Sequence, residues 1–147
     1  MSKFAHLDST GGVGEEVAHQ VISAGHPPIA EGLFLIDFDA TIAPFGFLFD
    51  FPEPIIGAPK FIQKLKERGY RIGIFTSRLS PVWLQSANQK AQDHIDYITE
   101  YCARYEIPFD FVTAEKVPAL GYIDDKAIEF KGSWSDIWIR FASKGWL

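Results

Sequence analysis

Residues 33–41 read LFLIDFDAT, a stretch that begins as a buried strand and ends in charge. Its apolar residues, Leu33–Ile36 and Phe38, are as dense as in a strand that is covered on both faces. Asp37 and Asp39 nevertheless interrupt the run two residues apart, and Thr41 follows. Unpaired carboxylates are costly to bury, so this pair indicates a site at the end of the strand.

Strand and helix patterns alternate along the rest of the chain. Apolar spacing predicts helices over 59–69, 81–106 and 133–145, and strands over 70–78, 109–113 and 119–125. In the first helix we expect Phe61, Ile62 and Leu65 to face inward and Gly69 to form the cap, and Pro81 opens the second helix. This alternation is typical of an α/β fold with a doubly wound parallel sheet, whose site lies beyond the carboxyl ends of the strands.

Aromatic residues stand out in two places. Phe45, Phe47, Phe49 and Phe51 alternate strictly, which predicts a strand or hairpin with one aromatic face. That face serves either for packing or as a platform for a ligand. Trp134 and Trp138 lie at helical spacing in the last helix, where we expect them in the core.

Composition limits the classes of protein. The 147 residues carry 14 Lys and Arg against 19 Asp and Glu, a net charge of −5. This balance gives no strong signal for nucleic acid, which draws on clustered Lys and Arg. No apolar stretch approaches the roughly 18 residues that cross a bilayer, so no membrane partner is expected. Cys102 is the only cysteine and is expected on a helix face, so a reducing, cytoplasmic location is the natural interpretation.

Polar side chains follow several predicted strands at the same end. Asp37 and Asp39 close the first, Thr76 the second, and Asp124 and Asp125 a later one. Converging carboxylates would repel one another and raise their pKa values. A divalent cation relieves this repulsion, and oxygen ligands without Cys or His favour Mg²⁺. Such a cluster suits phosphoryl transfer, with one carboxylate as nucleophile and a second as general acid.

These residues are similar to the motifs of the haloacid dehalogenase (HAD) superfamily of aspartate-nucleophile phosphohydrolases. LFLIDFDAT resembles its first motif, GIFTSR the second, Lys116 the third and GYIDDKAIEF the fourth. The resemblance implies a Mg²⁺-dependent phosphatase that hydrolyses a phosphomonoester through an aspartyl-phosphate. It also implies a HAD-like catalytic domain over 31–147, preceded by an arm and short helix over 1–30. The connections are too short for a separate cap domain, so the open site admits small phosphorylated molecules, nucleotides or larger substrates.

The resemblance assigns a role to each matching residue. Asp37 is the expected nucleophile and Asp39 the acid and base, and both bind the metal, Asp39 through its backbone carbonyl. Thr76 and Lys116 would hold the phosphoryl group. Asp124 is the expected metal ligand, with Asp125 as a second ligand or an outer-shell acceptor; which of the two touches the metal stays open.

Several alternatives remain. Lys126 could replace Lys116, although a surface ion pair suits it as well. Ser77 and Arg78 either bind substrate or serve as a helix cap and an ion pair; Ser80 is another candidate cap. Ala40 stands where the family usually has glycine, so we expect a less strained backbone there. Two other functions compete: a phospho-receiver signalling domain and a catalytically silent HAD-fold binding module.

Overall fold

A computed structural model describes residues 32–147; the predicted arm and helix within 1–30 lie outside this range. The strands are β1 (Leu33–Asp37), β2 (Arg71–Phe75), β3 (Phe111–Thr113) and β4 (Gly121–Ile123). The helices are α3 (Ala58–Glu67), the 3-10 turn η1 (Ser77–Leu79), α4 (Pro81–Ser86), α5 (Ala91–Arg104) and α6 (Trp134–Ser143).

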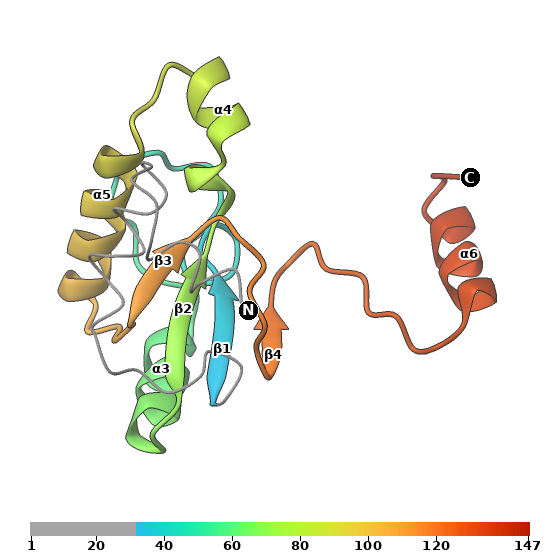
Figure 1. Cartoon of the computed structure of the whole chain (residues 1–147), viewed down its shortest axis with the longest axis horizontal. Helices are drawn as coiled ribbons and strands as arrows, with labels where there is room; N and C mark the ends of the chain where they lie inside the picture. Colours follow the sequence, from blue (N-terminus) through green and yellow to red (C-terminus); the bar gives the residue numbers. More distant parts are fainter. Residues whose placement is uncertain (1–31) are drawn as a thin grey trace.

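The four strands form one parallel sheet in the order β3-β2-β1-β4 (Figure 1). This arrangement confirms the predicted α/β class with a parallel sheet. It also puts β1 in the interior, between the strand that leads to Thr76 and the strand that leads to Asp124. Leu33, Leu35 and Ile36 are almost fully buried, as the apolar run predicts.

The described helices that pack on the sheet share one face of it. Ile36, Ile72 and Ile74 of the strands form one core with Ile62 of α3 and Ile98 of α5. Steps from β1 to β2 and from β2 to β3 run in the same direction, so two right-handed crossovers put both helices on the same side. The connection from β3 to β4 runs back past two strands and contains no helix. Within residues 32–147, therefore, helices cover one face only.

The predicted helix over 81–106 is wrong in one respect, because it is two helices. Pro81 opens α4 as expected, with Ser80 at the cap position but without a side-chain cap bond. Asn88 then adopts a left-handed backbone conformation, with φ at 51°, and ends α4. Asparagine tolerates this conformation better than most residues. In α3, Ile62 is buried as predicted, whereas the side chain of Phe61 is half exposed.

The alternating phenylalanines form neither a strand nor a hairpin. Residues 45–51 form an irregular loop. Three tyrosines in α5 or directly after it fix the backbone of residues 50–52 through their hydroxyls. These tyrosines donate to loop carbonyls in the pairs Tyr97–Asp50, Tyr101–Pro52 and Tyr105–Phe51. Because tyrosine hydroxyls satisfy these carbonyls, the segment needs no partner strand. Cys102 lies on the same helix, as expected; it is buried, and burial raises its pKa to about 12.

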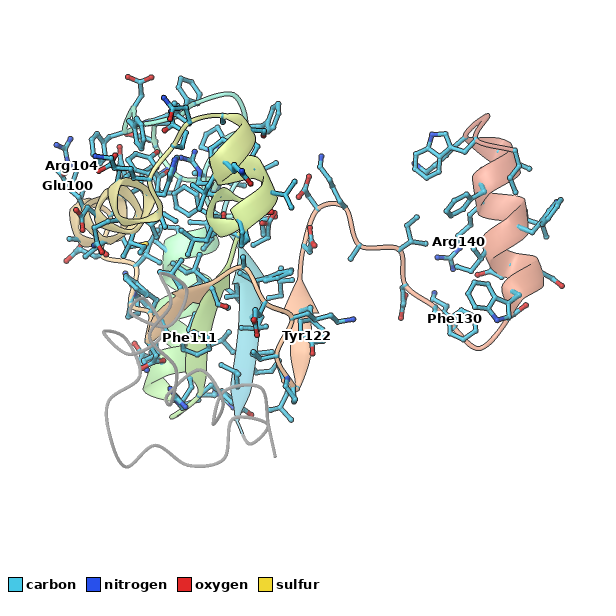
Figure 2. The ribbon with its side chains drawn as sticks, turned by 45° about the horizontal axis from the view of Figure 1, so that its top comes forward. Glu100, Arg104, Phe111, Tyr122, Phe130 and Arg140 are labelled. Atoms are coloured by element: carbon cyan, nitrogen blue, oxygen red, sulfur yellow. The ribbon has the colours of Figure 1, made fainter. Side chains whose placement is uncertain are left out.

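The last helix lies apart from the sheet, so the predicted core positions of its tryptophans are wrong. Trp134 is 77% exposed and Trp138 is 66% exposed. Ser133 caps the helix by accepting the amide hydrogen of Asp136, so α6 begins as a well-formed helix. Figure 2 shows Phe130 and Arg140 with α6, distant from Tyr122 on β4. Within residues 32–147, none of the helices has the length and apolarity needed to cross a membrane.

Candidate functional site: a carboxylate cluster at the end of β1 and β4

Three carboxylates meet where the strand order reverses. Asp37 is the last residue of β1, and Asp124 and Asp125 follow β4 directly. Because β4 pairs in parallel with β1, both strands deliver their carboxyl ends to the same point. One carboxylate oxygen of each residue lies within 4.8 Å of the others. These three residues, here called the carboxylate cluster, could hold a metal ion.

The arrangement makes the Asp37 carboxyl group harder to ionise. Burial raises its pKa to about 7, helped by a hydrogen bond with Asp125 and by the negative charge of Asp124. Burial also opposes ionisation of Asp125, but hydrogen bonds with Asp37, Asp124 and the backbone, together with the positive charge of Lys126, outweigh it and lower that pKa. The pKa of Asp37 thus rises as predicted, but burial contributes most to the rise and repulsion from the neighbouring carboxylates contributes less. Thr41 Oγ1 donates to Asp37 Oδ2 over 3.3 Å, which orients the carboxylate.

Asp39 lies beside the carboxylate cluster, but its side chain binds Arg78 instead. Arg78 Nε and Nη2 donate to the two carboxylate oxygens of Asp39, each over 2.8 Å. The Arg78 side chain is 6% exposed and that of Asp39 is 25% exposed, so the pair is largely shielded from water. Such a bidentate pair is stronger and more directional than a surface ion pair.

Arg78 also holds the loop above the site. Nη2 donates to the carbonyl of Phe47 over 2.6 Å, and Nη1 donates to that of Leu48. Both nitrogens of the fork, and Nε, are thus engaged within the protein. The structure gives Arg78 a positioning role that was not predicted from the sequence, which left open only substrate binding or an exposed ion pair. In the sequence, nothing next to Arg78 indicates that its side chain binds the Asp39 carboxylate.

The hydroxyls after β2 divide between backbone and pocket. Thr76 is buried, and its Oγ1 accepts the amide hydrogen of Arg78 over 3.1 Å, which caps η1. Thr76 is not among the described residues that line the pocket, whereas Ser77 is. Of the two predicted substrate-binding residues with a hydroxyl, Ser77 therefore lies at the pocket, whereas the Thr76 hydroxyl binds the backbone.

The two candidate lysines also separate. Lys126 lines the pocket, with Nζ 3.6 Å from Asp125 Oδ2 and 5.8 Å from the centre of the Phe45 ring. Lys116 is not among the described lining residues, and its Nζ lies 4.9 Å from the centre of the Tyr122 ring. The structure brings the alternative lysine to the site, because Lys126 follows the acidic pair directly.

The pocket above the carboxylates has a volume of about 650 Å³. Its lining combines charged residues with apolar side chains. These apolar residues are Phe45, Phe47, Leu48, Phe75 and Trp83. Trp83 belongs to α4 and was not predicted as a site residue, because nothing in its own stretch of sequence distinguishes it from a packing residue.

Ala40, in the turn between Asp39 and Thr41, has a left-handed backbone conformation with φ at 62°. The expectation of a less strained backbone there is wrong. The turn requires the conformation because the carbonyl of Phe38 accepts the amide hydrogens of Ile42 and Ala43, both over 2.9 Å. A residue with a Cβ is disfavoured in this region by roughly 1–2 kcal/mol.

Replacing Ala40 with glycine should therefore stabilise the protein. We expect Ala40→Gly to raise the free energy of unfolding by about 1 kcal/mol, as measured by urea denaturation. The exposed helical Ala103→Gly is the control and should lower it by about 0.5–1 kcal/mol. A loss of stability in both variants would contradict the strain at Ala40.

Removing the buried guanidinium of Arg78 should lower the free energy of unfolding far more than removing an exposed cation. Arg78→Met leaves Asp39 and two loop carbonyls without their donor, so we expect the free energy of unfolding to fall by about 3 kcal/mol. Lys64→Met, which breaks an exposed pair with Glu67, should change it by less than about 0.5 kcal/mol. Equal effects in urea denaturation would show that Arg78 contributes no more than a surface charge.

Comparisons with known proteins found no match for this chain among family models, curated proteins or solved structures. The functional argument therefore depends on the geometry of the carboxylate cluster, the Asp39–Arg78 pair and the pocket above them.

Proposed function

We propose that the protein is a Mg²⁺-dependent phosphatase of the HAD type, which hydrolyses phosphomonoesters through an aspartyl-phosphate on Asp37. The observation that carries this proposal is the parallel pairing of β1 with β4, which brings Asp37 against Asp124 and Asp125. Under this proposal the sheet is the core of a HAD-like, doubly wound fold without a separate cap domain.

Two properties of the carboxylate cluster support a divalent cation. Oxygens on opposite sides of a Mg²⁺ ion are about 4.2 Å apart, and the three carboxylate oxygens already lie within 4.8 Å of one another. The pKa of Asp37 is raised mainly by burial and further by its acidic neighbours, and a cation would stabilise the ionised carboxylate against both effects. Asp37, Asp124 and Asp125 would hold the ion, which when bound would stabilise negative charge on the phosphate oxygens.

The chain supplies both groups that the reaction needs. A carboxylate oxygen of Asp37, oriented by Thr41, attacks phosphorus while the bond to the leaving oxygen breaks. Asp39, whose two oxygens accept from Arg78 in this structure, must take up a proton for this step and donates it to that leaving oxygen. In the second half, Asp39 takes a proton from water, the water oxygen attacks phosphorus, and the bond to Asp37 breaks to release phosphate.

Two residues at the pocket are available to the phosphoryl group. Lys126 provides the positive charge, and Ser77, which also lines the pocket, provides a hydroxyl. Arg78 acts differently in this proposal: it fixes the direction of the Asp39 carboxylate through its two parallel hydrogen bonds.

The first test compares wild type with variants of the two aspartates. Asp37→Asn keeps the size of the side chain but removes the attacking anion, so phosphate release from a panel of phosphomonoesters should fall below detection. Asp39→Asn should slow release by about 10² to 10⁴. Both rates are measured with Mg²⁺ and again with a chelator, which should abolish the wild-type activity. Asp96→Asn, on the outer face of α5, is the control.

Acetyl phosphate separates the enzyme from the other two candidates. Its leaving group needs little protonation, so Asp39→Asn should accumulate protein carrying one phosphoryl group, visible by intact-mass spectrometry, while wild type should not. Wild type that is stably phosphorylated without turnover would favour the receiver domain. Wild type that neither turns over nor becomes phosphorylated would favour the silent binding module, and full activity in Asp37→Asn would exclude Asp37 as nucleophile.

A further inference from the structure

Three aromatic side chains at the mouth of the pocket have no part in the proposed hydrolysis. Phe45 and Phe47 come from the loop after β1, and Trp83 comes from α4. Phe45 is 75% exposed and Phe47 is 40% exposed, although each lines the same pocket as the carboxylate cluster. We call these three residues the aromatic rim.

Two of the three residues of the aromatic rim contact buried side chains of other elements. Arg78 binds the backbone of Phe47 while it binds the Asp39 carboxylate, so the loop and the candidate acid are fixed by one side chain. Trp83 packs edge-on against the buried ring of His94, with ring centres 5.1 Å apart. The rings of Phe45 and Phe47 are exposed to solvent, which costs free energy of hydration unless a ligand covers them.

The charges of the pocket restrict what that ligand is. Four carboxylates line it, and of the two lining cations Arg78 is engaged by Asp39 and the loop. Lys126 is then the one lining cation, among the described residues, that remains for a substrate phosphate. Ser77 and Ser80 are the lining hydroxyls. A second phosphate finds no further lining cation among the described residues, whereas a flat uncharged ring finds three aromatic side chains.

We infer that the substrate is a monophosphate ester whose leaving group carries a planar aromatic ring, which stacks on the aromatic rim while the phosphate lies at Asp37. This inference rests on the proposed phosphatase activity and adds the substrate class to it. Two sources share this chemistry: the base of a nucleoside monophosphate and the ring of an aryl phosphate.

Matched substrate pairs test the inference by changing only the ring. Adenosine 5′-monophosphate differs from ribose 5-phosphate by the base, and phenyl phosphate differs from cyclohexyl phosphate by aromaticity. Base–aromatic stacking is worth about 1–3 kcal/mol, so we expect kcat/KM to favour the aromatic member of at least one pair by about tenfold or more. The first pair reports on nucleotides and the second on aryl phosphates.

Variants then assign the preference to the aromatic rim. Phe45→Ala and Trp83→Leu should each lower the ratio of kcat/KM between the aromatic and non-aromatic members toward one. Phe61→Ala, which removes a half-exposed ring on α3 outside the pocket lining, should leave this ratio unchanged. A ratio that falls equally in all three variants would overturn the assignment to the rim.

The outcomes separate this inference from the proposed function. Hydrolysis of both members of each pair at similar kcat/KM would overturn the inference and leave the phosphatase intact. If wild type hydrolyses none of the four compounds, the phosphatase proposal fails, and calorimetric titration of wild type with adenosine 5′-monophosphate and ribose 5-phosphate decides the inference. About tenfold tighter binding of the nucleotide would support the aromatic rim as a ring-binding site, and equal affinity would overturn it.

Discussion

Phe34, Leu35 and Ile36 of β1 pair with Gly121, Tyr122 and Ile123 of β4, and this short parallel ladder holds three carboxylates against one another. The chain reaches β4 only after it has built β2 and β3 on the other side of β1, so the acidic pair that follows β4 returns to the end of the first strand. Repulsion among the carboxylates opposes this arrangement, as the raised pKa of Asp37 records. Apolar burial along β1 offsets that cost, since several of its residues are removed from water almost completely.

A second constraint connects the site to the loop above it. Arg78 comes directly after β2, yet its side chain binds both the Asp39 carboxylate and the backbone of residues 47 and 48. The tyrosines of α5 bind the next stretch of the same loop, at residues 50–52. The loop therefore takes its shape from side-chain donors on other elements. In the proposed enzyme, this one loop would couple the orientation of the acid to the position of the aromatic rim.

Much of the fold follows from patterns that are local in the sequence. The apolar runs of the strands predicted the parallel sheet. The carboxylates at strand ends predicted a cluster of Asp37, Asp39, Asp124 and Asp125, from which the side chain of Asp39 departs because it binds Arg78. What failed depends on partners distant in the chain. The alternating phenylalanines resemble a strand in sequence, but tyrosine hydroxyls bind the backbone carbonyls of residues 50–52. Trp134 and Trp138 resemble core residues in sequence, but α6 lies away from the sheet and both are exposed. Likewise, nothing adjacent to Arg78 in sequence indicates that it binds Asp39. Of the two lysines, Lys126 lines the pocket because it follows the acidic pair after β4, whereas Lys116 precedes β4.

Calorimetric titration with Mg²⁺ shows whether Asp37, Asp124 and Asp125 form one site for a divalent cation. Wild type should bind one ion per chain, and Asp124→Asn should bind it much more weakly. Because Mg²⁺ competes with the proton on Asp37, whose pKa is raised to about 7, affinity should increase as the pH rises through that value and then level off. Absence of binding, or binding of equal strength in wild type and Asp124→Asn, would contradict the account.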